Sequence, residues 1–101
     1  MKISRKHAKS GSTFLCDGEL TIYTVAAAKA ELLNDSDNSI DPIALDLKHV
    51  SELDTAGVQL LLFTKKIMAD NNKRIYLKHS NEYVDGVLNN FDVATQFILE
   101  Q

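Results

Sequence analysis

Two short segments in which apolar and polar residues alternate flank a stretch long enough for a helix. The segments are IALDL, residues 43–47, and RIYLKH, residues 74–79. Alternation with a period of two predicts β-strands, and the leucine-rich residues 56–69 between them predict a helix. Strands that are joined through a helix lie parallel in one sheet. The chain is therefore expected to fold as an α/β protein.

The residues before this unit predict two more strands and another helix. STFLC, residues 12–16, favours a strand, and residues 3–7 alternate weakly, as an edge strand does. This opening pair predicts an antiparallel hairpin. IYTVAAAKAELL, residues 22–33, is rich in good helix formers, with Thr21 as the candidate N-cap.

The end of the chain adds a third, shorter helix with Asn81 as its candidate cap. VATQFILE, residues 93–100, fits either a short helix or a last strand. With 101 residues and no linker, the chain is long enough for one domain, over residues 1–101. We expect a single small domain, with a mixed sheet of four to five strands and three to four helices packed on it.

Composition narrows the classes of function. The net charge is −3 and no long basic run occurs, which argues against nucleic-acid binding. Cys16 is the only cysteine, so no internal disulfide forms, in keeping with a reducing compartment. The longest fully apolar run, residues 60–63, is too short to cross a bilayer, and no signal peptide is evident. We expect a soluble cytoplasmic protein that does not insert into membranes.

The helix expected over residues 56–69 has more apolar surface than one sheet needs. On a helical wheel its apolar side chains form two stripes. The first is Leu60, Phe63 and Ile67, and the second is Val58, Leu61, Leu62, Met68 and Ala69. Geometry favours packing of the second stripe against neighbouring helices. The alternative is that part of it is exposed and meets a partner protein.

A short polar motif precedes this helix. Asp54 and Thr55 are residue types that cap helix N-termini, because a side-chain oxygen accepts an unpaired backbone N–H. Gly57 either admits a neighbouring backbone or relaxes the first turn. A capping box is absent, because Val58 stands where glutamate or glutamine would be required. Capping explains the motif from the residues alone, and the other hypothesis is that another protein acts on the hydroxyl.

No pattern of catalytic or metal-binding residues emerges. The acidic loop 34–42 lacks the glycine and glutamate of an EF-hand, with Ile40 and Asp46 at those positions. No serine has a nucleophile-elbow context, and no pair of carboxylates suggests acid–base chemistry. The remaining candidate ligands are scattered without zinc-site spacing: His7, His49, His79 and Cys16. We expect no enzymatic activity, no metal and no cofactor.

Three segments in order resemble a STAS domain, the family of bacterial anti-sigma-factor antagonists and of cytoplasmic domains of sulphate transporters. They are IALDLKHV, SELDTAGVQLLL and RIYLKHSNEYVDGVLNNF, and the earlier CDGELTIYTVAAAKAEL is similar to the family's Gly-Glu-Leu and first-helix segment. The likeness runs from about Ser12 onward. Its most specific part is Asp-Ser/Thr-x-Gly, here residues 54–57.

The resemblance implies a non-catalytic signalling protein whose hydroxyl residue after the aspartate, here Thr55, is phosphorylated. A partner serine/threonine kinase adds the phosphate and a phosphatase removes it; the partner is an anti-sigma factor or switch protein kinase in bacterial transcription regulation. The usual residue there is serine, so threonine weakens the sigma-factor assignment while keeping the hydroxyl. The implied partner-binding residues are Gly18 and Glu19, in a loop, and Asp54, Thr55, Ala56, Gly57 and Val58.

Other STAS proteins carry threonine at this position and imply an alternative function. They are constitutive subunits of lipid-transport ABC complexes, in which the STAS subunit braces the ATPase. The same surface would then hold a transporter subunit, and Thr55 would not need to be phosphorylated.

Overall fold

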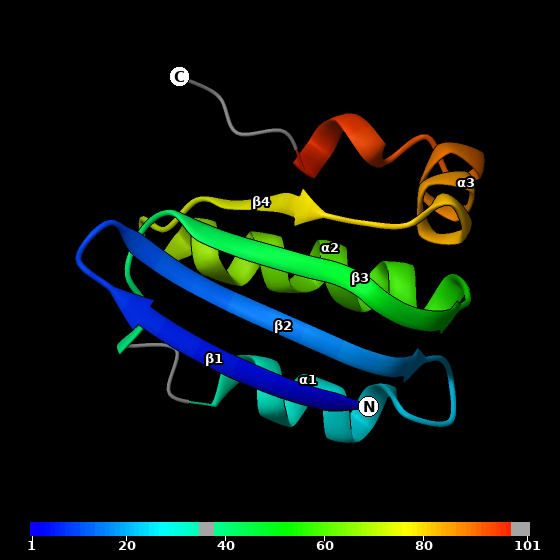
Figure 1. Cartoon of the computed structure of the whole chain (residues 1–101), viewed down its shortest axis with the longest axis horizontal. Helices are drawn as coiled ribbons and strands as arrows, with labels where there is room; N and C mark the ends of the chain where they lie inside the picture. Colours follow the sequence, from blue (N-terminus) through cyan, green and yellow to red (C-terminus); the bar gives the residue numbers. More distant parts are fainter. Residues whose placement is uncertain (35–37, 98–101) are drawn as a thin grey trace.

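The strands form one mixed, four-stranded sheet in the order β1-β2-β3-β4 (Figure 1). The strands are β1 (Lys2–Ala8), β2 (Gly11–Leu20), β3 (Ile43–Leu53) and β4 (Ile75–His79). β1 and β2 pair antiparallel, whereas β2 with β3 and β3 with β4 pair parallel. This computed structural model describes residues 1–34 and 38–97. The expected hairpin and the parallel strands joined through helices are confirmed.

Two helices cover one face of this sheet. α1 (Val25–Leu33) lies beneath β1 and β2, and α2 (Thr55–Asp70) lies beneath β3 and β4 (Figure 1). α3 (Glu82–Asn90) sits near the carboxyl end of β3, and η2 (Ala94–Phe97), a 3-10 helix, follows it alongside β4. The expected short element after residue 93 is therefore a 3-10 helix as far as Phe97, and residues 98–100 lie outside the described residues.

The core lies between the sheet and the two helices. Alternate residues of β2 are buried, because successive side chains of a strand point to opposite faces. The largest fully buried apolar side chains come from strands and helices alike: Phe14, Leu20, Leu32, Ile43, Leu45, Leu47, Leu61, Met68 and Leu88. In the part of the chain that the structure describes, no helix is both long and apolar enough to cross a membrane.

Both stripes of α2 contribute to the core, but they do so unevenly. Val58, Leu61 and Met68 of the second stripe are almost completely buried. The largest exposed side chain belongs to the first stripe, where Leu60 is buried and Phe63 is 38% exposed. The largest apolar side chain that α2 leaves exposed, Phe63, therefore lies on the first stripe, on the side that faces α1. On the second stripe, Leu62 is partly exposed and the small Ala69 is exposed.

Three predicted boundaries also differ from the structure. The helix expected from residue 22 begins at Val25, and Thr24 rather than Thr21 occupies the N-cap position. The strand expected over residues 43–47 continues to Leu53. β2 continues to Leu20, so Gly18 and Glu19 belong to the end of a strand and not to a loop.

Candidate functional site

The site is built around the junction of β3 and α2, where Asp54 is the N-cap of the helix. One carboxylate oxygen, Oδ1, accepts a hydrogen bond from the backbone N–H of Gly57 at 2.9 Å. The other, Oδ2, accepts from the backbone N–H of Ile22 at 2.9 Å. The bonds from Ile22 and Gly57 hold the pKa of Asp54 below its usual value, because they stabilise the ionised form. Asp54 thus caps α2 and also fixes the loop between β2 and α1.

Thr55 is the first residue of α2 and is exposed. Because Asp54 accepts the bonds from the first turn, the hydroxyl of Thr55 is not needed as a cap. Within the described residues, that hydroxyl makes no side-chain hydrogen bond. An incoming protein can therefore reach this oxygen without the fold having to open.

Gly57 allows the start of α2 to approach the end of β2 closely. A Cβ added to Gly57 would lie 2.2 Å from the carbonyl oxygen of Leu20 and 2.8 Å from Cδ1 of Leu53. Gly57 is buried, and Val58 is only 2% exposed. In this fold both residues position the site rather than present a surface, whereas the neighbouring Ala56 is partly exposed.

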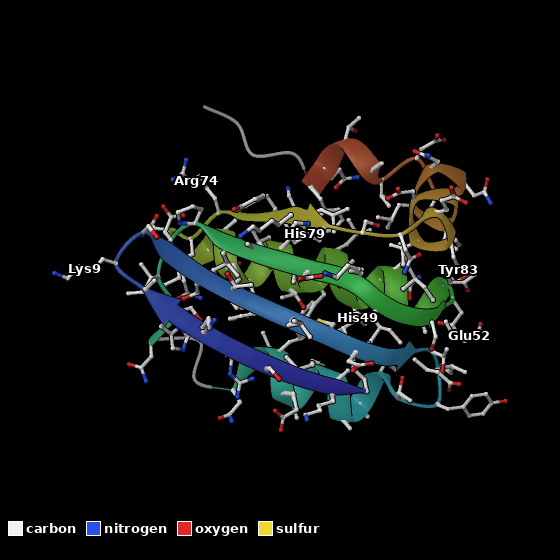
Figure 2. All side chains as sticks on the ribbon, viewed as in Figure 1. Lys9, His49, Glu52, Arg74, His79 and Tyr83 are labelled. Carbon is white, nitrogen blue, oxygen red and sulfur yellow. The ribbon has the colours of Figure 1, made fainter. Side chains whose placement is uncertain are left out.

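A tyrosine on α3 holds the site from the opposite side. The hydroxyl of Tyr83 accepts a hydrogen bond from the backbone N–H of Leu53 at 3.0 Å and lies 3.4 Å from Oε2 of Glu52. Figure 2 shows Tyr83 and Glu52 together at this end of the molecule. No local pattern in the sequence points to Tyr83, because its partners lie about 30 residues earlier in the chain.

Asn81 joins α3 to the same strand. Its Oδ1 accepts from the backbone N–H of Val84 at 2.8 Å, which confirms it as the cap of α3. Its Nδ2 donates to the carbonyl oxygens of Lys48 and Val50 at 2.9 and 3.0 Å. The second half of β3 is therefore anchored to α3 through side chains, which fixes the strand that presents Asp54 and Thr55.

The end of β2 brings Gly18 and Glu19 to the same end of the sheet. Gly18 has a φ of +114°, a conformation that favours glycine. Glu19 is exposed and is the register partner of Glu52 on β3, which is exposed too. The carbonyl oxygen of Glu19 accepts a hydrogen bond from Oγ1 of Thr24 at 2.9 Å. The structure thus gathers Glu19, Glu52 and the start of α2 at the carboxyl ends of two parallel strands.

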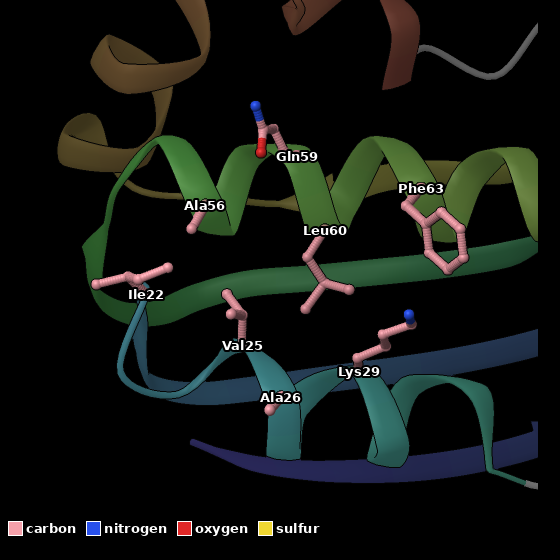
Figure 3. A pocket seen from close by; sticks show the side chains of 8 residues that line it. All are labelled: Ile22, Val25, Ala26, Lys29, Ala56, Gln59, Leu60 and Phe63. Carbon is pink, nitrogen blue, oxygen red and sulfur yellow. The ribbon is translucent and has the colours of Figure 1, made fainter.

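An open groove with a volume of about 340 Å³ lies beside the site, between α1 and α2 (Figure 3). Ile22 and Ala56 lie at one end of the groove, and Lys29 and Phe63 face each other at the other end. The side chain of Ile22 is 63% exposed. Eight residues line the groove: Ile22, Val25, Ala26, Lys29, Ala56, Gln59, Leu60 and Phe63.

The remaining candidate residues do not converge. Nδ1 of His7 lies 2.7 Å from Oγ of Ser12, while His49 and His79 are exposed on two different strands. Burial, and to a lesser extent the nearby charge of Asp46, raises the pKa of the Cys16 thiol to about 12. Across residues 1–34 and 38–97, no group of three or more His, Cys, Asp or Glu side chains is arranged to hold a metal ion.

The acidic loop before β3 is anchored by its last aspartate, Asp41, and by Ile40, whose backbone N–H donates to Oγ of Ser12 at 2.7 Å. Oδ2 of Asp41 accepts a hydrogen bond from Nη2 of Arg74 at 2.9 Å, and this contact lowers the pKa of Asp41. The remaining two aspartates of the loop, Asp35 and Asp37, lie outside the described residues.

Comparison with known proteins places this arrangement in a family. The family model of the STAS domain matches residues 3–100, so the chain belongs to the STAS domain family. None of the curated proteins matches the chain significantly.

Two solved structures share the fold. One is the anti-sigma factor antagonist SpoIIAA in its unphosphorylated form, with a TM-score of 0.76 and 16% sequence identity over 99% of this chain and 88% of the other. The second is SpoIIAA, a Bacillus cell fate determinant, in its phosphorylated form, with a TM-score of 0.70 and 16% identity over 99% and 91% of the two chains. This level of identity shows that the chains have the same fold.

Proposed function

We propose that the protein is a non-catalytic regulatory binding protein of the anti-sigma-factor-antagonist type, switched by reversible phosphorylation of Thr55. The observation that carries the proposal is the exposed hydroxyl of Thr55, held on a fixed helix start but not used by the fold. The structural likeness to SpoIIAA, which is known in unphosphorylated and phosphorylated forms, supports it. A serine/threonine kinase partner in the cytoplasm would add the phosphate, and a phosphatase would remove it.

The switch would act on the interface and leave the fold intact. A phosphate adds a charge of about −1.5 to −2. At a helix N-terminus that charge is tolerated, because the unpaired N–H groups and the helix dipole favour anions. In a protein interface the same group must lose its water, and each ~1.4 kcal/mol of that cost weakens binding tenfold.

The neighbours of Thr55 would sharpen this effect. Asp54 is ionised and already engaged with Ile22 and Gly57, so it adds negative charge beside the phosphate. Glu19 and Glu52 are exposed at the same end of the sheet. A partner that docks here in the unphosphorylated state would meet a strongly anionic surface after phosphorylation. We assign the contact to Asp54, Thr55 and Ala56, with Glu19 at its edge, while Gly18, Gly57 and Val58 shape it.

The first test is to phosphorylate the intact protein with the serine/threonine kinases of its own genome and to map the product by mass spectrometry. We expect a single phosphate on Thr55. The buried Thr64 of the same helix is the internal control and should stay unmodified in the folded protein. A phosphate at another residue, or none with any of the kinases, would overturn the proposal.

The second test measures binding to the kinase that modifies the protein. Thr55→Glu should lose binding by a factor of 10 or more, which corresponds to about 1.4 kcal/mol. Thr55→Val, which keeps the shape without the hydroxyl, should retain it. Thr95→Glu makes the same change at another exposed threonine, on η2, and should bind normally. Equal binding by Thr55→Glu would instead favour a constitutive scaffold, such as the subunit of a lipid-transport ABC complex.

A further inference from the structure

The groove between α1 and α2 is an apolar surface that the fold leaves uncovered. Ile22 is 63% exposed at one end, and Phe63 is 38% exposed at the other. The adjoining Tyr23 is 93% exposed. Large apolar side chains that gather on one surface mark a place where another molecule binds. Ala56, the residue after Thr55, lines the groove, so this surface is continuous with the proposed phosphorylation site.

The shape of the groove suits a helix. α1 and α2 each connect parallel strands, so they run side by side with their N-termini at the same end (Figure 3). Two such helices leave a channel that accepts the side-chain ridge of a third. Ala56 and Phe63 are seven residues apart, which is about 10 Å, or two turns of a bound helix. The small side chains of Ala26 and Ala56 would let its backbone come close.

A small-molecule ligand is a poorer fit. Pockets for such ligands enclose most of the ligand surface, about 70–90% or more. This groove is instead open to solvent along its length. An open channel can hold one row of side chains from a larger molecule while the rest of that molecule stays outside.

The charge in the groove defines the partner further. Of the eight lining residues, Lys29 alone is charged, and its ammonium lies 4.8 Å from the centroid of the Phe63 ring. The ring holds the cation over the apolar surface, in a contact of the cation–π type. A carboxylate is the group that complements an ammonium there, because it can form a charge-assisted hydrogen bond. The far end of the groove therefore selects an acidic side chain.

We propose that the groove binds an amphipathic helix of the partner protein, with apolar side chains in the channel and a carboxylate against Lys29. This inference rests on the proposed function, since it describes the second half of the same partner surface. The partner is then held at two places: the helix in the groove, and the contact at Thr55, which phosphorylation would disrupt.

The test uses two stapled helical peptides of about 18 residues, long enough to be stable helices. Both carry the same leucine stripe; one has glutamates and the other lysines beside it. The intact, isotope-labelled protein is titrated with each peptide and followed by NMR. We expect the glutamate peptide to shift the amide signals of Ala26, Lys29 and Phe63 and to bind about tenfold more tightly than the lysine peptide.

Matched variants separate the groove from the rest of the surface. Ala26→Arg should fill the channel and abolish binding, whereas Ala27→Arg, exposed on the same helix but outside the groove, should not. Lys29→Glu should reverse the preference between the two peptides. The control Lys6→Glu, on the exposed edge strand, should leave it unchanged.

Three results would overturn the inference. One is the absence of shifts at the groove with either peptide, and another is equal binding of both peptides. The third is self-association of the free chain that Ala26→Arg abolishes, because the groove would then belong to a second copy. Peptide binding and self-association are both measured without phosphorylation. The inference about the groove can therefore fail while the proposed switch at Thr55 holds, and the switch can fail while the groove still binds the peptide.

Discussion

The first turn and the middle of α2 each carry a threonine, and the two hydroxyls differ in exposure and in hydrogen bonding. Thr64 is completely buried, and its Oγ1 donates to the carbonyl oxygen of Leu60 at 2.8 Å. Thr55 is exposed, and Asp54 supplies the cap that it could have provided. The comparison teaches that position on the helix, and not residue type, decides which hydroxyl is open to modification. Four predictions test this contrast and the contacts that create it.

The largest effect is expected when a negative charge is placed at each threonine in turn. Thr64→Glu buries an unpaired carboxylate and should cost about 3–5 kcal/mol of unfolding free energy, a large part of the ~5–15 kcal/mol typical of a domain. Thr55→Glu should change it by less than about 1 kcal/mol, because a helix N-terminus tolerates anions. Urea unfolding measures both changes in free energy. Similar losses in the two variants would mean that Thr55 and Thr64 do not differ in burial.

The second prediction concerns the glycine that lets the first turn approach β2. Gly57→Ala should lower the unfolding free energy by about 1–3 kcal/mol, because the added methyl group meets the carbonyl oxygen of Leu20. Gly86→Ala on α3 is the control. A Cβ there meets nothing within 4 Å, so it should stabilise by roughly 0.5–1 kcal/mol. The denaturation midpoints of the two variants should move in opposite directions. An unchanged midpoint for Gly57→Ala would contradict the close approach of α2 to the end of β2.

Third, Tyr83 is expected to stiffen the strand end that presents Thr55. Tyr83→Phe leaves the backbone N–H of Leu53 without its partner and should cost about 1 kcal/mol. Amide hydrogen exchange at Leu53 should speed up accordingly. Tyr76→Phe is the matched control, because the Tyr76 hydroxyl has no side-chain hydrogen bond in the described part of the chain. An unchanged exchange rate at Leu53 in Tyr83→Phe would mean that α3 does not stabilise the strand end that presents Thr55.

The smallest effect concerns the charge of Asp54. Its pKa in the folded protein is lowered, so its stabilising effect is complete above the unfolded value of about 3.9 and is lost as the pH falls through the folded value. Asp54→Asn should therefore be less stable than the natural chain at neutral pH, and the gap should close in acid. Urea midpoints of both proteins, measured from neutral pH down to about pH 2, check this. A difference in midpoint that stays constant over this range would mean that the charge of Asp54 does not stabilise the fold.

Much of the fold was predictable because local patterns decided it. The alternation in residues 43–47 and 74–79 matches β3 and β4, and Asn81 caps α3 as predicted. The second half of β3 escaped prediction for a physical reason. Lys48 and His49 are both exposed, next to an irregularity in the pairing with β2, and this breaks the period of two on which the prediction rests.

The start of α1 was misjudged because a distant residue sets it. The backbone N–H of Ile22 donates to Asp54, 32 residues later, and so is drawn out of the helix that its sequence favours. Residues 21–24 form a turn instead, with the backbone N–H groups of Thr24 and Val25 donating to the carbonyl oxygen of Thr21. No local propensity can signal such a bond. It also places Ile22 at the mouth of the groove.

Local residue patterns set the order of strands and helices and the polar motif at residues 54–57, because hydrophobic period and capping chemistry act over a few neighbouring residues. Three other features come from the packing of helices on the sheet: Thr55 is exposed while Thr64 is buried, Gly57 lies against the end of β2, and Lys29 faces Phe63 across a groove. These facts depend on which surfaces of separate elements meet when the helices pack on the sheet. Burial and proximity arise there, from contacts between residues far apart in the chain.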